Sequence, residues 1–267
     1  MRISLSKLIG VVFGLSLVLA CSVSALADNS QILTPETIVS GIVKENIQKF
    51  TGSPNEVITY NGLKELPHGK VYEVTTKTGR FYVNTKTGDI ESAIIRNGLS
   101  ASSINAKNLD SMKAQVKAFA EKNYKNFTSK KMVLTESRII DHGDAGKEYL
   151  FIWNEIVGEA YTQSTVQISV LPDWNNSITY VGIDRPLLVN TTPEVSRDDA
   201  QEKTLRAFDM GASAKTQSKL VVIPFDNNQK LVWIIDTIEL DKDNMSRGGT
   251  VTVDAVSGNV LSTNPLQ

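Results

Sequence analysis

The sequence has only one cysteine, Cys21, and two histidines, His68 and His142, among 267 residues. A single cysteine cannot form an intramolecular disulfide, so the fold depends on buried cores for its stability. The histidines lie far apart in the chain and no H-E-x-x-H motif is present, which excludes a zincin-type metallopeptidase. Gly-rich phosphate loops and G-x-S-x-G elbows are absent as well. The familiar signatures of these enzyme classes are therefore missing.

The N-terminus has the layout of a secretory signal peptide. Arg2 and Lys7 precede an apolar run from 8 to 20, and the small residues A-L-A end at Ala27. The apolar run is too short for a comfortable membrane span. We predict that segment 1–27 is removed and that the exported protein is secreted or extracytoplasmic.

An alternative is a lipoprotein signal, because the residues V-L-A-C that end at Cys21 resemble a lipobox. Leu at the second position of that box fits poorly, whereas A-L-A before Asp28 fits well. Lipidation at Cys21 would anchor the protein to a membrane, whereas cleavage after Ala27 would remove its only thiol.

The overall composition is that of a folded globular protein. Hydrophobic residues make up 41% of the chain and charged residues 21%. Removing the signal segment deletes two basic and no acidic residues, which changes the formal net charge from −1 to −3. This charge gives no reason to expect nucleic acid or an anionic membrane as a partner.

Three segments repeat the same order, a helix followed by antiparallel strands. Helices are predicted to open at Thr34-Pro35, near Asp110, and at Ser196, where Asp199 completes the pattern of a capping box. The small, polar stretch that follows the first repeat predicts a linker. The sequence thus predicts an α+β fold of repeated helix-plus-meander units with bounds 28–97, 108–191 and 192–267.

An aromatic residue occupies one strand of each repeat: Tyr72, Trp153 and Trp233. Each belongs either to the core or to a groove, and the core is favoured because large aromatic side chains dominate core burial.

Two tight turns mark the ends of the outer repeats. In F-Y-V-N-T-K-T-G-D-I the turn contains Asn84 and Gly88, and in V-T-V-D-A-V-S-G-N-V it contains Asp254 and Gly258. Glycine supplies the positive φ that such a turn needs, and Asn or Asp can accept hydrogen bonds from the turn's own amides.

These segments resemble the PepSY domain family, whose last strand follows the pattern V-D-A-x-T-G-x-V. Residues 250–261 match it with Ser257 in place of Thr, and residues 81–90 match it with Asn84 in place of Asp. The middle repeat departs from it, because residues 171–178 lack the glycine turn. The resemblance implies a cystatin-like fold and a role in restraining or chaperoning extracellular peptidases, since similar units occur in propeptides of thermolysin-like metallopeptidases.

Polar clusters in the sequence are better explained as turns than as reactive sites. Asp141, His142 and Asp144 could surround a metal, but D-H-G-D is more typical of a solvated turn. The segment 241–244 resembles the start of a calcium loop yet lacks the glycine and terminal glutamate that such a loop needs. We therefore predict no enzyme activity, no catalytic residues, no metal and no cofactor.

Two function classes remain. The first is an exported, non-catalytic module that binds an extracytoplasmic protein, with a peptidase as the expected partner. Trp174, in the turn P-D-W-N-N, is the candidate contact residue, and an unpaired strand edge is the other candidate surface. The alternative is a structural or assembly protein of the cell surface or envelope that has no peptidase partner.

Overall fold

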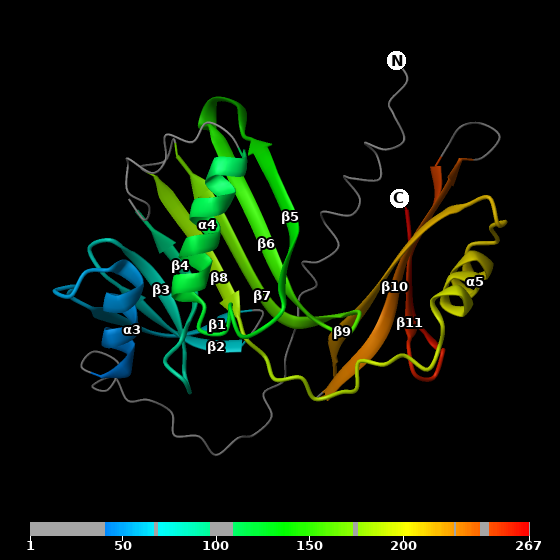
Figure 1. Ribbon diagram of the computed structural model, residues 1–267, viewed down its shortest axis with the longest axis horizontal. Coiled ribbons are helices and arrows are strands. Elements are labelled where there is room, and N and C mark those ends of the chain that lie inside the picture. The colour runs from blue at the N-terminus through cyan, green and yellow to red at the C-terminus, as the bar shows by residue number, and fades with distance from the viewer. Residues whose placement is uncertain are drawn as a thin grey trace. The chain divides into compact units, whose positions relative to one another are not determined.

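The computed structural model describes residues 41–66, 69–96, 109–172, 176–226, 228–240 and 246–266 (Figure 1). The signal segment 1–27, His68 and Trp174 lie outside these ranges. No helix in the described part of the chain is long and apolar enough to span a membrane.

The chain divides into two compact units. Unit 1 takes the described parts of Met1–Ser129, Leu134–Trp153 and Thr165–Ile183, and unit 2 those of Lys130–Val133, Asn154–Ser164 and Asp184–Gln267.

Unit 1 begins with what we call the N-terminal module, one helix followed by a four-stranded meander. It consists of α3 (Ile42–Thr51), β1 (Thr59–Leu66), β2 (Gly69–Thr75), β3 (Gly79–Asn84) and β4 (Ile90–Ile95). Neighbouring strands pair antiparallel in chain order. A second helix and strand series follows: α4 (Leu109–Asn123), β5 (Met132–Asp141), η1 (Gly143–Ala145), β6 (Lys147–Val157), β7 (Ala160–Leu171) and β8 (Ser177–Ile183). β8 pairs antiparallel with both β4 and β7, which joins the two series into one sheet.

Helix α3 is amphipathic because Val43, Ile47 and Phe50 recur at helical spacing, and all three are buried. The ring of Phe50 makes edge-to-face contacts with Phe81 and Tyr180, at centroid distances of 6.0 and 5.0 Å. Truncating such a buried ring typically costs about 3–5 kcal/mol. This contact fixes the helix on the buried face of the meander.

The start of α3 differs from the sequence-based prediction. The helix begins at Ile42, with Gly41 at its N-cap and no side-chain cap, whereas we predicted a start at Thr34-Pro35, which lie outside the described residues. Glycine costs about 1 kcal/mol relative to alanine inside a helix. Gly41 is therefore a natural boundary.

Unit 2 contains the C-terminal module, again a helix followed by a four-stranded antiparallel meander. Its elements are α5 (Arg197–Ala207), β9 (Lys215–Phe225), β10 (Asn228–Leu240), β11 (Ser246–Asp254) and β12 (Val260–Pro265). The Ser196 side chain accepts a hydrogen bond from the Asp199 amide at 3.1 Å and donates one to its carboxylate at 2.6 Å. The predicted cap of this helix is therefore confirmed.

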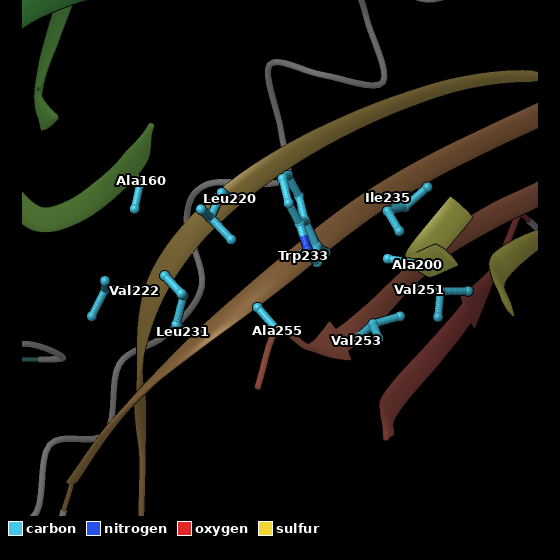
Figure 2. Close-up of a cluster of buried hydrophobic side chains, with 10 residues drawn as sticks. All are labelled: Ala160, Ala200, Leu220, Val222, Leu231, Trp233, Ile235, Val251, Val253 and Ala255. Atoms are coloured by element: carbon cyan, nitrogen blue, oxygen red, sulfur yellow. The ribbon is translucent and has the colours of Figure 1, made fainter. Parts of the chain in front are cut away.

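The core of unit 2 surrounds Trp233, which is 2% exposed (Figure 2). Its indole Nε1 donates to the Val195 carbonyl at 2.9 Å, so the one polar atom of the ring is satisfied. Aliphatic side chains from α5, from β9, β10 and β11 with the residue after it, and from the first residue of β7 (Ala160–Leu171) complete the cluster: Ala160, Ala200, Leu220, Val222, Leu231, Ile235, Val251, Val253 and Ala255. Tyr72 and Trp153 are equally buried, which confirms the core assignment of all three aromatic residues.

The fold is α+β with sheets dominated by antiparallel pairs, as the sequence predicts. One pairing was not predicted: the start of β7 lies parallel to β9, through Tyr161 and Val221. Side-chain alternation along a strand does not reveal which strand lies beside it. The division into predicted units at 28–97, 108–191 and 192–267 stays a prediction.

Candidate functional site

The two glycine turns that the sequence singled out have nearly the same geometry. Gly88 lies at φ 73° and Gly258 at φ 74°. The Oδ1 atom of Asn84 accepts from the Lys86 and Thr87 amides at 2.9 and 3.0 Å. Oδ1 of Asp254 accepts from the Val256 and Ser257 amides, both at 3.0 Å. Asn84 and Asp254 therefore accept equivalent backbone hydrogen bonds in the two turns.

Backbone hydrogen bonds close each turn in the same way. The Gly88 amide donates to the Asn84 carbonyl at 3.1 Å, and the Gly258 amide donates to the Asp254 carbonyl at 2.8 Å. The strand pairing shifts register just before each turn, at Val83 in one module and at Val253 in the other. The glycine turns of the N-terminal and C-terminal modules are thus structural repeats of each other.

Each turn is also fastened to the helix of its own module. Nδ2 of Asn46 on α3 donates to the Gly88 carbonyl at 2.8 Å, and Nζ of Lys203 on α5 donates to the Gly258 carbonyl at 2.5 Å. A Cβ atom added at Gly88 would lie 2.9 Å from Ile42 Cγ2. Sequence analysis missed Asn46 and Lys203, although each stands three residues after the first buried residue of its helix.

The C-terminal turn differs in carrying a charge. The second oxygen of Asp254 accepts from Lys230 Nζ at 2.9 Å. Burial alone would raise the pKa of Asp254, but the Lys230 side chain and the Ser257 and Val256 amides outweigh it and lower the pKa to about 2. Asp254 therefore stabilises this module as an anion. In the N-terminal turn Asn84 Nδ2 instead donates to Glu91 Oε1 at 2.8 Å.

The D-H-G-D segment forms a hydrogen-bonded turn. His142 Nε2 lies 2.9 Å from Glu148 Oε2, and Asp141 Oδ1 accepts from the Gly143 amide at 2.9 Å. Among the described residues, no group of three or more histidine, cysteine or acidic side chains is placed to hold a metal ion. The residues 241–244 are not described.

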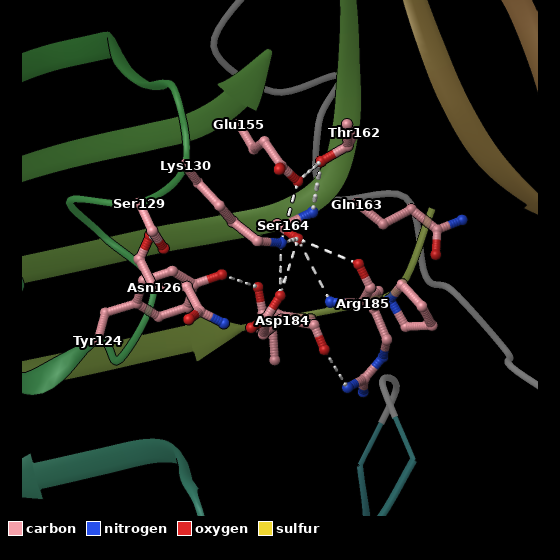
Figure 3. A network of polar contacts seen from close by, with 12 residues as sticks. Tyr124, Asn126, Ser129, Lys130, Glu155, Thr162, Gln163, Ser164, Asp184 and Arg185 are labelled. Carbon is pink, nitrogen blue, oxygen red and sulfur yellow. Dashed lines mark hydrogen bonds and ion pairs between the residues drawn. The ribbon is translucent and has the colours of Figure 1, made fainter. Parts of the chain in front are cut away.

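A polar network in unit 2 centres on Lys130, which sequence analysis did not identify (Figure 3). Its Nζ lies 2.6 Å from Asp184 Oδ1, 2.9 Å from Ser164 Oγ and 3.2 Å from Glu155 Oε2. Thr162 Oγ1 donates to the same Glu155 oxygen at 2.6 Å. Because Ser164 is fully buried and Glu155 nearly so, these contacts satisfy groups that would be costly to bury alone.

The Ser164–Lys130 pair has the spacing of a nucleophile and its base but not the surroundings. Three acceptors surround the ammonium, so its N–H donors are used, and a charged ammonium has no lone pair to take the hydroxyl proton. The Ser164 hydroxyl is also shielded from solvent. The arrangement therefore joins β6, β7 and the segment after β8 rather than forming a catalytic dyad.

The candidate contact residue Trp174 lies outside the described residues. The C-terminal turn does expose two apolar side chains, Val256 at 48% and Val260 at 46%. In the N-terminal turn, Lys86 takes the place of Val256 and is polar. Ile90 takes the place of Val260 and is only 8% exposed. This apolar pair is therefore not a requirement of the turn itself.

Comparison with known proteins places the C-terminal module in a family. Residues 194–264 match the family model described as "Peptidase propeptide and YPEB domain", PepSY. The match spans α5 to β12 and includes both Asp254 and Gly258. The chain therefore carries a PepSY domain over these residues, as the resemblance in its last turn indicated.

One similar solved structure is the Bacillus megaterium YpeB C-terminal domain. It is 16% identical, with 89% of this chain and 99% of that chain covered, and the TM-score is 0.48. No curated protein matches the sequence.

Proposed function

We propose that this chain is an exported, non-catalytic PepSY protein that binds an extracytoplasmic peptidase and restrains or chaperones it. The observation that carries the proposal is the match of residues 194–264 to a family described by peptidase propeptides. Export rests on the signal-like segment 1–27.

Val256 and Val260 are the contact surface that we propose on the PepSY domain. Protein interfaces bury a central apolar patch within a polar rim, and exposed β-branched side chains beside a rigid turn can supply the start of such a patch. The turn that carries them is held by the Asp254 and Lys203 hydrogen bonds. Binding would then need little reordering of this segment.

The decisive experiment titrates the purified chain, without residues 1–27, into the secreted peptidase fraction of its host. Saturable inhibition, or co-purification with an identified peptidase, is the expected result. Val256→Lys should weaken this inhibition or co-purification. The fold should tolerate the substitution, because the turn of the other module already has a lysine, Lys86, at the equivalent position. Trp174→Ala tests the residue that the sequence singled out.

The alternative is a structural or assembly role at the cell surface, for which lipidation at Cys21 would be the anchor. N-terminal sequencing of the exported form distinguishes the two. A start at Asp28 agrees with secretion, whereas a lipid-modified Cys21, together with no inhibition of any peptidase, would replace our proposal with the surface role.

A further inference from the structure

A pocket of about 370 Å³ lies on the N-terminal module, on the face of the meander opposite α3. Val74, Phe81 and Ala93 pair across β2, β3 and β4 and are fully buried. Because side chains alternate along a strand, the next cross-strand row must point the other way. That row contains Thr75, Arg80 and Ile94.

Three cationic side chains line this pocket, and among the described residues no acidic side chain does. Lys77, Arg80 and Arg96 stand around it, together with the hydroxyl residues Thr75 and Thr76, Gly79 and the exposed Ile94. We call this set the basic pocket. Cations gathered in one concave place attract an anionic ligand more strongly than the same charges spread over the surface.

Two carboxylates near the basic pocket each act on one of its cations, Glu56 on Lys77 and Glu73 on Arg80. Glu56 Oε1 accepts from the Thr78 hydroxyl and amide at 2.9 and 3.3 Å. Glu73 Oε1 lies 3.9 Å from Arg80 Nε, at the outer limit of an ion pair. The Arg80 side chain remains 53% exposed, so part of its guanidinium donor set faces solvent.

The C-terminal module provides an internal comparison. Its equivalent cross-strand row is Asp236, Thr250 and Asn264. Thr250 therefore takes the place of Arg80, and an acidic residue takes the place of Thr75. Since this row of the C-terminal module contains no cation, the meander does not need Arg80 in order to form.

We propose that the basic pocket binds an acidic peptide segment of a partner protein. Arg80 would hold one carboxylate with two N–H donors, Lys77 and Arg96 would attract its acidic neighbours, and Ile94 would contact the aliphatic part of a side chain. The proposal does not depend on the partner being a peptidase, because the site lies outside residues 194–264 and is tested with a peptide alone.

The test is a fluorescence-anisotropy titration of a labelled oligoglutamate peptide with the chain from Asp28 onward. Saturable binding that weakens as salt rises is expected. Arg80→Thr should weaken it by about tenfold or more, since charge-assisted hydrogen bonds are the strong contacts of such a site. This substitution introduces the residue that the other module has at the same position, so the fold should persist, and a thermal melt verifies that.

The matched controls are Lys77→Gln and Lys49→Gln, which remove the same charge from the pocket and from α3 on the other face of the sheet. Only Lys77→Gln should weaken peptide binding. Unchanged binding by Arg80→Thr, or equal weakening by Lys49→Gln, would overturn the proposal. So would displacement of the peptide by inorganic phosphate at equal concentration, or equally strong binding to phosphatidylglycerol vesicles.

Discussion

Replacing Gly258 with alanine is the sharpest test of how the PepSY domain is held together. The glycine lies at φ 74°, and an added Cβ would clash with Lys203 Nζ and stand 3.3 Å from Val195 Cγ2. The lysine end is flexible and can move away, but it then loses its hydrogen bond to the Gly258 carbonyl. The substitution therefore carries both a backbone cost and a contact cost.

These two costs can be estimated separately. An L-residue in the left-handed region costs about 1–2 kcal/mol, and reduced freedom of the unfolded chain returns about 0.4–1 kcal/mol. Loss of a hydrogen bond from a charged donor adds about 1.5–3 kcal/mol, and partial exposure of Lys203 favours the lower end. We expect Gly258→Ala to lower the free energy of unfolding by about 2–3 kcal/mol, which corresponds to roughly 5–10 °C in Tm.

Gly158→Ala is the matched control within the same unit. Gly158 lies at φ 63°, and its added Cβ would meet only Thr191 Oγ1, at the ordinary distance of 3.7 Å. This variant should show the backbone cost alone, about 1 kcal/mol. Thermal and denaturant unfolding, monitored by circular dichroism, measure the loss of stability in both variants. If Gly258→Ala costs no more than Gly158→Ala, the helix contact contributes nothing and the reasoning fails.

Three further predictions concern charged groups. Asp254→Asn should keep the turn, as Asn84 does in the other module, but should lower the free energy of unfolding at pH 7 by about 2 kcal/mol. Because the native pKa of Asp254 is about 2, the difference between wild type and variant should shrink as pH falls from about 4 through 2. A difference that stays constant over this range would contradict the prediction. Lys130→Met should cost about 2–3 kcal/mol by leaving the buried Glu155 without its cation, and a change near zero in denaturant unfolding would show the network to be dispensable. Burial raises the pKa of Asp236 against the opposing effects of Thr250 and Lys219, so the ionised carboxylate lowers the stability of the fold at neutral pH. Asp236→Asn should therefore raise Tm at pH 7. This increase in Tm should disappear as pH falls below the native pKa of Asp236.

Several features of the fold are readable from the sequence because they depend on near neighbours in the chain. Ser196 caps its helix through Asp199, three residues on. Gly258 takes a positive φ, and Asp254 accepts from amides two and three residues later. Such contacts need no knowledge of the rest of the molecule. The α+β class follows in the same way from the alternation of a capped helix with short strands.

The tertiary contacts of these local elements cannot be read from the sequence. Nothing near Gly258 in the sequence points to Lys203, and nothing near Lys130 points to Asp184, because each pair meets only after the strands between them have aligned. The parallel contact of Tyr161 with Val221 and the row that places Arg80 between Thr75 and Ile94 depend likewise on strand register. Local sequence determined the turns, caps and buried faces of this protein. Strand pairing decided which charges meet, because register brings together residues that hydrophobic alternation leaves unassigned.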